Sequence, residues 1–167
     1  MNNIGDKIGT SIGLFVIYVF LISFTIGGLI GTGFGVRQLY LANQSRYWST
    51  TSGTITYSDI RVIENEESTT NNSYQPVVKY SYQVNDSYFT SDRILFGTLF
   101  FRDIIQASKI LELYPVNQEV TVYYDSDYPQ DSVLEAGLTK KSFVPVTAGV
   151  FIFTLFATVT VLIWSFN

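Results

Sequence analysis

Two long stretches of the chain carry no Asp, Glu, Lys, Arg or His, and they limit the possible folds more than any other feature of the sequence. They cover residues 8–36 and 142–167. A helix of about 20 apolar residues crosses the roughly 30 Å hydrocarbon core of a bilayer, and a backbone in lipid has to bond its own polar groups. The sequence therefore predicts two transmembrane helices, residues 8–36 and 144–165, with Pro145 in the first turn of the second.

A cleaved signal peptide is the alternative interpretation of the first stretch. Its apolar run is far longer than the roughly 7–15 residues typical of a signal peptide. The residues that follow, Leu39-Tyr40-Leu41-Ala42, also lack the small-x-small pattern of a cleavage site. We therefore expect a retained span and an integral protein of a plasma or inner membrane, whose first partner is the lipid bilayer.

Three glycines in the first stretch, Gly27, Gly31 and Gly35, recur at four-residue spacing. Glycines four apart on a helix let a second backbone approach closely. We expect this helix-packing face to contact the second span, a second copy of the chain, or another membrane protein. Neither stretch holds the charged side chains that transporters place inside the membrane, so the sequence does not favour a two-span pump or transporter.

The distribution of basic residues predicts which side of the membrane the middle of the chain faces. Arg37, Arg46, Lys140 and Lys141 flank the middle segment, whereas Lys7 lies on the opposite side. The positive-inside rule therefore predicts a cytoplasmic central domain. A composition rich in Ser, Thr and Asn is also common outside cells, so an extracellular domain is the alternative. Residues expected at the membrane interface are Arg37, Tyr47, Trp48, Lys140, Lys141 and Trp164.

The segment between the two apolar stretches changes from helical to strand-like patterning. Residues 37–48 are expected to extend the first helix out of the membrane, and residues 49–141 to form a small β-rich domain at the membrane surface. One helix is expected over residues 103–114, capped by Asp103 and ended by Pro115. The predicted class is α+β, with two transmembrane helices flanking an antiparallel sheet. Strands are expected at 53–63, 77–84, 88–94, 119–124 and 132–135.

The order of these features resembles a known family. Trp48 follows the first span, and Gly53-Thr54-Ile55 begins a strand. Tyr114-Pro115-Val116-Asn117, Val122-Tyr123-Tyr124-Asp125 and Ser132-Val133-Leu134-Glu135 come later, the last of them before the second span. This order resembles the family of bacterial two-span membrane proteins known as domain of unknown function 3592.

The resemblance implies a membrane-anchored β-rich module and supplies no activity, substrate or catalytic residue. Two turns depart from the family pattern. Asn117 stands where the family often has Gly, and Asn85-Asp86-Ser87 stands where Asp-Gly is common. Asn tolerates positive φ better than most residues, so we expect both turns to form.

Composition limits the chemistry available to the domain. The chain has no His and no Cys, which excludes imidazole and thiol catalysis, and 10 Lys+Arg against 14 Asp+Glu argue against a nucleic-acid binder. Asp125, Asp127 and Asp131 are the candidate ligands of a divalent cation, and the alternative for this segment is a turn. Glu64, Glu66 and Glu67 are expected to belong to a solvated polar loop over 64–73 rather than to a cation site.

The apolar segment Leu95-Phe-Gly-Thr-Leu-Phe-Phe101 has three possible interpretations. It could be buried, dip into the bilayer surface, or present a partner site. For the whole chain we expect a non-catalytic, membrane-anchored binding or assembly module without a cofactor. The alternatives are an accessory subunit of a larger membrane complex, and a divalent-cation-dependent hydrolase or transferase using the three aspartates.

Overall fold

The computed structural model describes residues 3–64 and 72–165, and the chain divides into two compact units. One unit comprises residues 1–37 and 143–167, and the other is Gln38–Ser142. We call the first the helical unit and the second the domain. Residues 65–71 of the loop expected over 64–73 lie outside the described residues.

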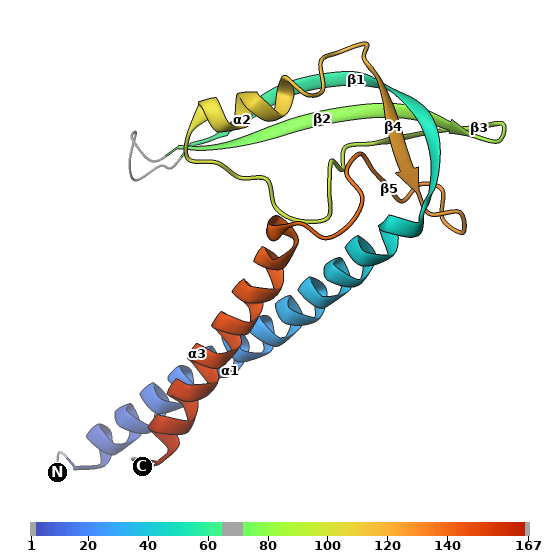
Figure 1. The fold of residues 1–167 in the computed structure, drawn as a ribbon. Helices are drawn as coiled ribbons and strands as arrows, with labels where there is room; N and C mark the ends of the chain where they lie inside the picture. Colours follow the sequence, from blue (N-terminus) through green and yellow to red (C-terminus); the bar gives the residue numbers. More distant parts are fainter. Residues whose placement is uncertain (1–2, 65–71, 166–167) are drawn as a thin grey trace. The chain divides into compact units, whose positions relative to one another are not determined.

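The helical unit consists of two long antiparallel helices, α1 (Asn3–Gln44) and α3 (Val144–Ser165), of which α1 continues into the domain. The two helices run side by side (Figure 1). The segments Phe15–Tyr47 and Lys140–Ser165 are long and apolar enough to cross a membrane. Pro145 is the second residue of α3, where its missing N–H interrupts no helical bond.

Hydroxyl side chains inside the helical unit bond to the backbone of their own helix. Thr25 Oγ1 donates to the carbonyl oxygen of Leu21, and Thr154 Oγ1 donates to that of Val150, one turn earlier in each case. A hydroxyl in an apolar surrounding is costly unless it is bonded. These local bonds therefore make the threonines compatible with a lipid environment.

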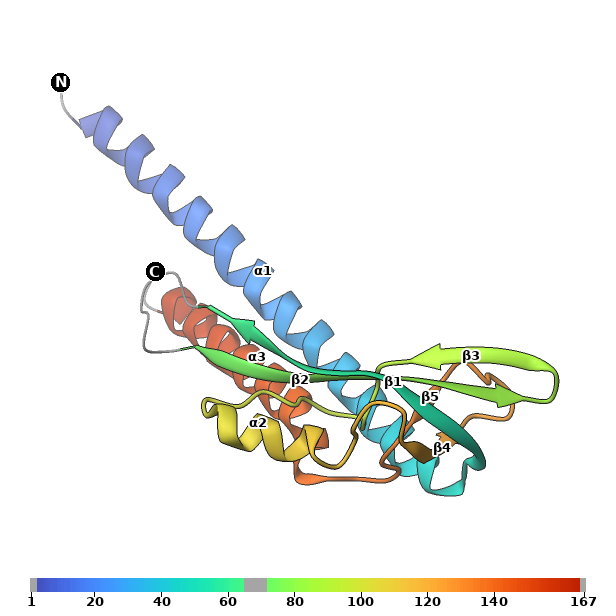
Figure 2. The ribbon, with the colours of Figure 1, turned by 90° about the horizontal axis from the view of Figure 1, so that it is seen from above.

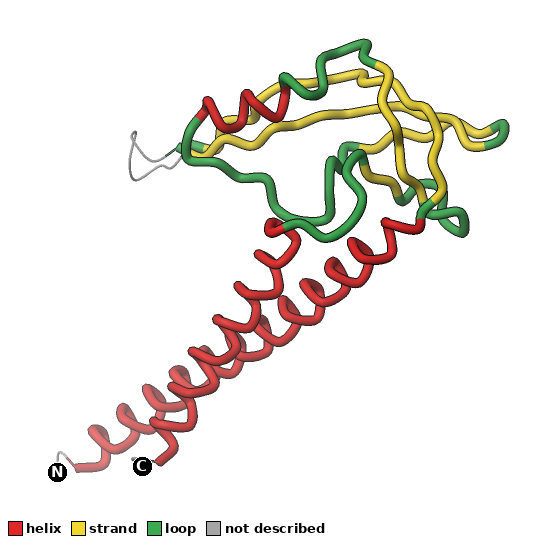
Figure 3. The backbone as a smooth tube through the Cα atoms, in the orientation of Figure 1, coloured by secondary structure: helices red, strands yellow, loops and turns green. Residues whose placement is uncertain are grey.

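The domain is built on a five-stranded antiparallel sheet with the order β3-β2-β1-β4-β5. Figures 2 and 3 show β1 and β2 as a long strand pair with the shorter strands on either side. The antiparallel sheet and the two long apolar helices confirm the predicted α+β class. The strands are β1 (Ser49–Ile63), β2 (Ser73–Val84), β3 (Ser87–Ser91), β4 (Glu119–Tyr124) and β5 (Ser132–Val133).

Both turns that were expected to need positive φ adopt it. Asn85 has φ 52° at the start of the turn between β2 and β3, and Asn117 has φ 69° before β4. Asparagine reaches this left-handed region at lower cost than other non-glycine residues. The predicted turn chemistry is therefore confirmed in spite of the two departures from the family pattern.

The helix of the domain, α2 (Ile104–Leu111), begins where the sequence predicted. The carboxylate of Asp103 accepts a hydrogen bond of 2.9 Å from the backbone N–H of Ile105, which satisfies one of the free donors of the first turn. Beyond Leu111 the chain continues in tighter turns as far as Tyr114, which precedes Pro115.

The domain core lies on one face of the sheet and follows the two-residue period of β2. Val78, Tyr80 and Tyr82 are buried in alternation along that strand. Ile55 and Val122 join them from β1 and β4, so the core connects strands that are far apart in sequence.

A second, smaller core cluster lies at the end of α1. Ala42 is fully buried there against Phe96 and Val133, and Trp48 meets the Phe96 ring edge to face with 5.6 Å between centroids. Residues Ser45–Tyr47 form a short 3-10 turn after α1, and Lys140–Phe143 form another before α3. The cluster attaches the last turn of α1 to the sheet.

Candidate functional site

The contact between α1 and α3 is made by glycines on both helices. A Cβ on Gly28 would lie 2.5 Å from the backbone nitrogen of Phe153, and one on Gly35 would lie 2.5 Å from that of Val146. Gly31 lies beside Gly149 of α3, with 3.7 Å from its ideal Cβ position to the Cα atom. Side chains at these positions would push the backbones apart, so the close packing depends on glycine.

The contact residues follow a seven-residue repeat. On α1 they are Phe24, Gly28, Gly31 and Gly35, at spacings of four, three and four. Phe24 stacks on Phe156 of α3 with 4.6 Å between ring centroids. A repeat averaging 3.5 residues is typical of left-handed helix packing. We call these residues, together with their partners on α3, the glycine seam.

The structure places Gly28, rather than Gly27, against α3. Gly31 and Gly35 lie in the seam, but a Cβ on Gly27 would meet nothing within 4 Å. A strict four-residue spacing drifts around an α-helix of 3.6 residues per turn, whereas alternating steps of four and three stay on one face. This difference in spacing explains why Gly27, the first of the three predicted glycines, does not face α3.

The residues expected at the membrane interface have different surroundings. Arg37, Lys140 and Trp164 are exposed, and Tyr47 has 82% of its surface accessible. Trp48 is half-buried and packs into the smaller core cluster of the domain.

Two buried serines, which we call the anchoring serines, join segments of the domain that are far apart in the sequence. Ser45 Oγ accepts a hydrogen bond of 2.8 Å from the backbone N–H of Gly137 and donates one to the carbonyl oxygen of Ala42. Ser142 Oγ donates to the carbonyl oxygen of Phe96. Both serines are fully buried, so each hydroxyl replaces a bond that the backbone would otherwise make with water.

The three candidate aspartates belong to the turn between β4 and β5. Asp125 Oδ1 accepts a bond of 3.0 Å from the N–H of Asp127, as in an Asx turn, and Asp131 pairs with the Arg93 guanidinium at 3.3 Å. Among the residues described by the structure, no group of three or more acidic, His or Cys side chains could hold a metal ion. The geometry of this segment is that of a turn.

Buried tyrosines join β2 to the segment around β5. Tyr80 Oη donates to the carbonyl oxygen of Arg93 and lies 3.0 Å from Ser132 Oγ. Tyr82 Oη donates to the carbonyl oxygen of Pro129 at 2.7 Å. Burial raises the pKa of Tyr80 to about 12, because the ionised phenolate would lose its hydration.

A third tyrosine has a carboxylate partner. Tyr114 Oη donates to Glu135 Oε1 at 3.0 Å. Burial first, and then the negative charge and hydrogen bond of Glu135, hold the pKa of Tyr114 well above its usual value. Neither Tyr80 nor Tyr114 therefore ionises near neutral pH to serve as a base. Their buried hydrogen bonds suit a structural role.

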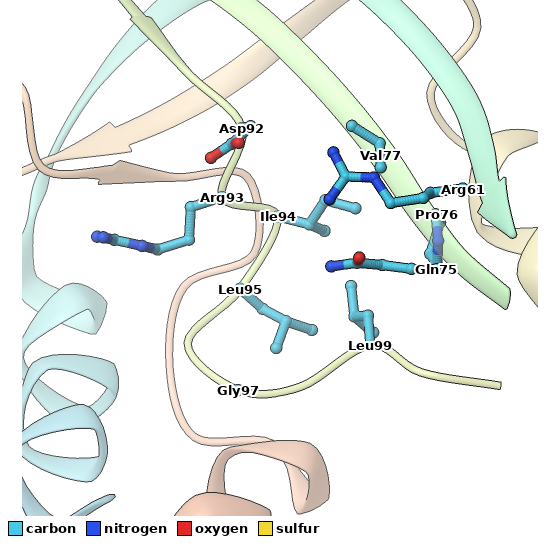
Figure 4. A pocket seen from close by; sticks show the side chains of 10 residues that line it. All are labelled: Arg61, Gln75, Pro76, Val77, Asp92, Arg93, Ile94, Leu95, Gly97 and Leu99. Atoms are coloured by element: carbon cyan, nitrogen blue, oxygen red, sulfur yellow. The ribbon is translucent and has the colours of Figure 1, made fainter. Parts of the chain in front are cut away.

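A cavity of about 220 Å³ lies between β2 and the loop that follows β3. Figure 4 shows the side chains of Arg61 and Gln75 extending over it from neighbouring strands, while the Arg93 side chain points away. Leu95 and Leu99 supply apolar lining, and Asp92 stands at one side. Arg61 and Gln75 can donate hydrogen bonds to a polar group, and the lining residues include no Ser, Thr, Cys, Lys, Tyr or His.

The apolar segment 95–101 is largely part of the domain interior. Leu95 and Phe96 are buried, and Leu99 packs against the main core. Phe101 pairs with Tyr74 through two backbone hydrogen bonds, whereas Phe100 is exposed. The buried interpretation therefore applies to most of the segment and leaves Phe100 outside.

The sequence analysis expected the second span as a possible partner of the glycine face, but it missed Gly28, Gly149 and the two anchoring serines. Gly149 is the single glycine of the second apolar stretch, and an isolated glycine in an apolar helix usually has a packing reason. Ser45 and Ser142 had no such signal, because serine is common throughout the chain. Their burial follows from partners far away in sequence.

The fold and the seam together define a class of protein in which a small antiparallel β domain is joined to two paired apolar helices long enough to cross a membrane. Residues 51–139 match the family described as domain of unknown function (DUF3592). The chain belongs to this family, as its motifs suggested, and the match covers most of β1 and the rest of the sheet. No curated protein matches the chain.

Proposed function

We propose that the protein is an integral membrane protein of a plasma or inner membrane, whose paired helices anchor a non-catalytic β domain with a binding or assembly role. The glycine seam carries this proposal, because it lets two apolar helices pack backbone to backbone as membrane helices do. Outside the seam, the helices expose large apolar side chains, including Phe15, Ile30 and Phe151, which favours lipid around them.

A partner that binds through α1 would use a face other than the seam. Gly27 and Gly33 have open space where a Cβ would stand, while α3 occupies the positions around Gly28 and Gly35. The proposal therefore assigns any second copy or membrane partner to the open side of α1. The accessory-subunit role is a special case of the same proposal.

The non-catalytic part of the proposal is supported by the chemistry of the chain. It has no His or Cys, Asp131 is paired with Arg93, and the carboxylate of Asp125 is used by its own turn. The cation-dependent hydrolase alternative predicts that Ca²⁺, Mg²⁺ or Mn²⁺ raises the melting temperature of the purified protein. We expect no such rise.

Crosslinking in native membranes tests the binding or assembly role. A photoreactive residue at Ile30, which is exposed on α1, should give a discrete adduct with a second copy or a partner. The same residue at Tyr88, which is exposed in the domain, reports partners of the sheet. Absence of adducts at both positions, together with a monomer in detergent, would contradict the proposed role.

A further inference from the structure

The second half of β1 has a strand partner on one side only. At Ile55, two backbone hydrogen bonds of 2.9 Å join β1 to Asn117 and Gln118, just before β4. The register of the ladder shifts at Thr56, and in the part of the chain that the structure describes residues 57–63 then pair with β2 alone. Figure 2 shows no further strand beside this end of β1. Residues 57–63 therefore form a free edge of the sheet, which we call the β1 edge.

The backbone groups of the β1 edge are placed to accept another strand. Ile60 stands opposite Pro76 of β2. Because proline has no N–H, these two residues cannot exchange backbone bonds, so the N–H and the carbonyl of Ile60 point away from β2. The N–H of Ile60 donates instead to the carboxylate of Asp59, at 2.7 Å. An unpaired row of such groups is a template for the addition of a strand.

Two side chains of opposite charge lie on the same face of the β1 edge. Asp59 and Arg61 are two residues apart on the strand, and both are exposed. The Asp59 carboxylate accepts bonds from the Ile60 N–H and the Tyr57 hydroxyl, neither of which carries a positive charge. Within the described residues, neither Asp59 nor Arg61 forms an ion pair.

Antiparallel pairing of the β1 edge with the same edge of a second copy would match these charges. A two-fold axis at Ile60 places Asp59 of each copy opposite Arg61 of the other. The two Ile60 residues then exchange backbone bonds, so the Asp59–Arg61 positions on either side are non-hydrogen-bonded pairs, whose Cα atoms are only about 4.5 Å apart. Opposite charges at such positions stabilise a strand pair, and like charges destabilise it. The charge pattern of the β1 edge is therefore complementary to itself.

Large apolar side chains of the β1 edge also find partners in this arrangement. Tyr57 of one copy comes opposite Ile63 of the other, on the face that carries the charges. In the single chain these side chains are 45% and 41% exposed. An aromatic side chain opposite a β-branched one is a stabilising cross-strand pair. The same two-fold axis thus matches the charges and covers exposed apolar surface.

We propose that the β1 edge binds the same edge of a second copy around a two-fold axis at Ile60, which joins two domains through one continuous sheet. The Asp59 carboxylate leaves the Ile60 N–H and binds Arg61 of the other copy, while that N–H donates to the Ile60 carbonyl across the axis. The proposal names a second copy as a partner for the proposed assembly role, on which it rests. The surface itself lies wholly within the domain.

Charge complementation in the full chain tests this pairing. Arg61→Asp gives an edge with two acidic groups, and Asp59→Arg gives one with two basic groups, so each variant should repel its own copies and match the other. Two copies with different tags are expressed together, solubilised in a mild detergent and captured through one tag, and the second tag is then quantified. Arg102→Asp is the matched control, because it makes the same charge change at an exposed position outside the β1 edge.

Wild-type copies should be captured together, and Arg102→Asp should stay within twofold of them. Arg61→Asp and Asp59→Arg should each lower the capture of their own kind at least fivefold, and mixing the two variants should restore it to within twofold. Restoration also shows that both variants are folded. A loss without restoration, or no capture of wild-type copies by each other, overturns the pairing.

Failure of the pairing and failure of the proposed function give different results. Capture that neither charge variant lowers overturns the role of the β1 edge and leaves self-assembly to another surface. Release of the wild-type chain from native membranes by alkaline carbonate contradicts the membrane function itself. A chain that stays in the membrane without capturing a second copy overturns the pairing and leaves the membrane anchor intact.

Discussion

At the scale of single residues, the hydroxyl of Tyr80 couples the stability of the domain to pH. The side chain is fully buried and bonds to Arg93 and Ser132. Its pKa is about 12 in the folded protein and about 10 in an unfolded chain. Below pH 10 both states keep the proton and the full stability is present. Between pH 10 and 12 only the unfolded state loses the phenolic proton of Tyr80, so the free energy of unfolding falls as pH rises.

We therefore expect Tyr80→Phe to weaken this pH dependence. The wild-type protein should lose about 1.4 kcal/mol by pH 11 through Tyr80. The variant should start about 1 kcal/mol less stable near neutral pH, because it lacks the hydroxyl bonds. Unfolding by denaturant in detergent at pH 8 to 11 measures both effects. Parallel pH profiles for the two proteins would show that the hydroxyl is not protected.

Two glycines beside the helix ends differ in what surrounds them. Gly97 has φ +148°, and a Cβ there would lie 2.7 Å from the backbone of Lys141. Gly137 has φ +97°, but the nearest atoms belong to the flexible side chain of Arg46, at 3.1 Å and beyond. Backbone cannot move aside as a side chain can, so the two positions should tolerate alanine differently.

We expect Gly97→Ala to destabilise the protein by about 3 kcal/mol and Gly137→Ala by about 1 kcal/mol. The second value reflects the unfavourable φ alone. Thermal and denaturant unfolding of the two variants, measured in the same detergent, gives the comparison. Equal losses would mean that contact with Lys141 is not the source of the difference.

At the scale of elements, the glycine seam decides how α1 and α3 pair. Gly28 faces the backbone of α3 and Gly27, its neighbour, faces open space. These two adjacent glycines form a matched pair, because leucine at either position adds the same apolar volume to the same helix. A membrane environment supplies little hydrophobic force between helices, so close packing carries most of the association.

We expect Gly28→Leu to separate the helices and Gly27→Leu to leave them paired. Cysteines replacing Phe24 and Phe156, whose rings stack at 4.6 Å, report the pairing by oxidative disulfide formation. Gly28→Leu should lower the crosslinking yield at least fivefold in membranes. A similar loss in Gly27→Leu would show that the seam is placed on the wrong face.

At the scale of the whole molecule, the cytoplasmic location predicted for the domain depends on the basic residues beside the apolar stretches. Arg37, Arg46, Lys140 and Lys141 lie on the domain side of the apolar stretches, and Lys7 lies on the other. Basic residues near a span favour the cytoplasmic side. Arg37 lies in α1, Arg46 lies in the 3-10 turn that follows it, and Lys140 and Lys141 lie in the turn before α3.

We expect Tyr88→Cys to resist a membrane-impermeant maleimide in intact cells and to react after permeabilisation. Ser165→Cys, at the end of α3, should show the reverse order. Both positions are exposed, so access and not burial controls the labelling. Labelling of Tyr88→Cys in intact cells would place the domain outside.

The local elements of the domain were predictable because their signals are local. The Asp103 cap, the positive φ of Asn85 and Asn117, and the alternation along β2 each depend on neighbours within a few residues. The strand predicted over 88–94 ends instead at Ser91, because Ile94 leaves the ladder to enter the core. A residue's choice between ladder and core depends on packing that short-range patterns do not contain.

The sequence by itself determined the two apolar helices, the α+β class and the family, because the absence of charge and the period of apolar residues act locally. Only the tertiary structure decided which glycines meet and which serines are buried. Gly28 rather than Gly27 lies in the seam because only one face of α1 contacts α3. Ser142 is buried because its hydroxyl donates a hydrogen bond to the carbonyl oxygen of Phe96, which is distant in the sequence. Contacts of this kind join distant residues, and their geometry exists only once the chain has folded.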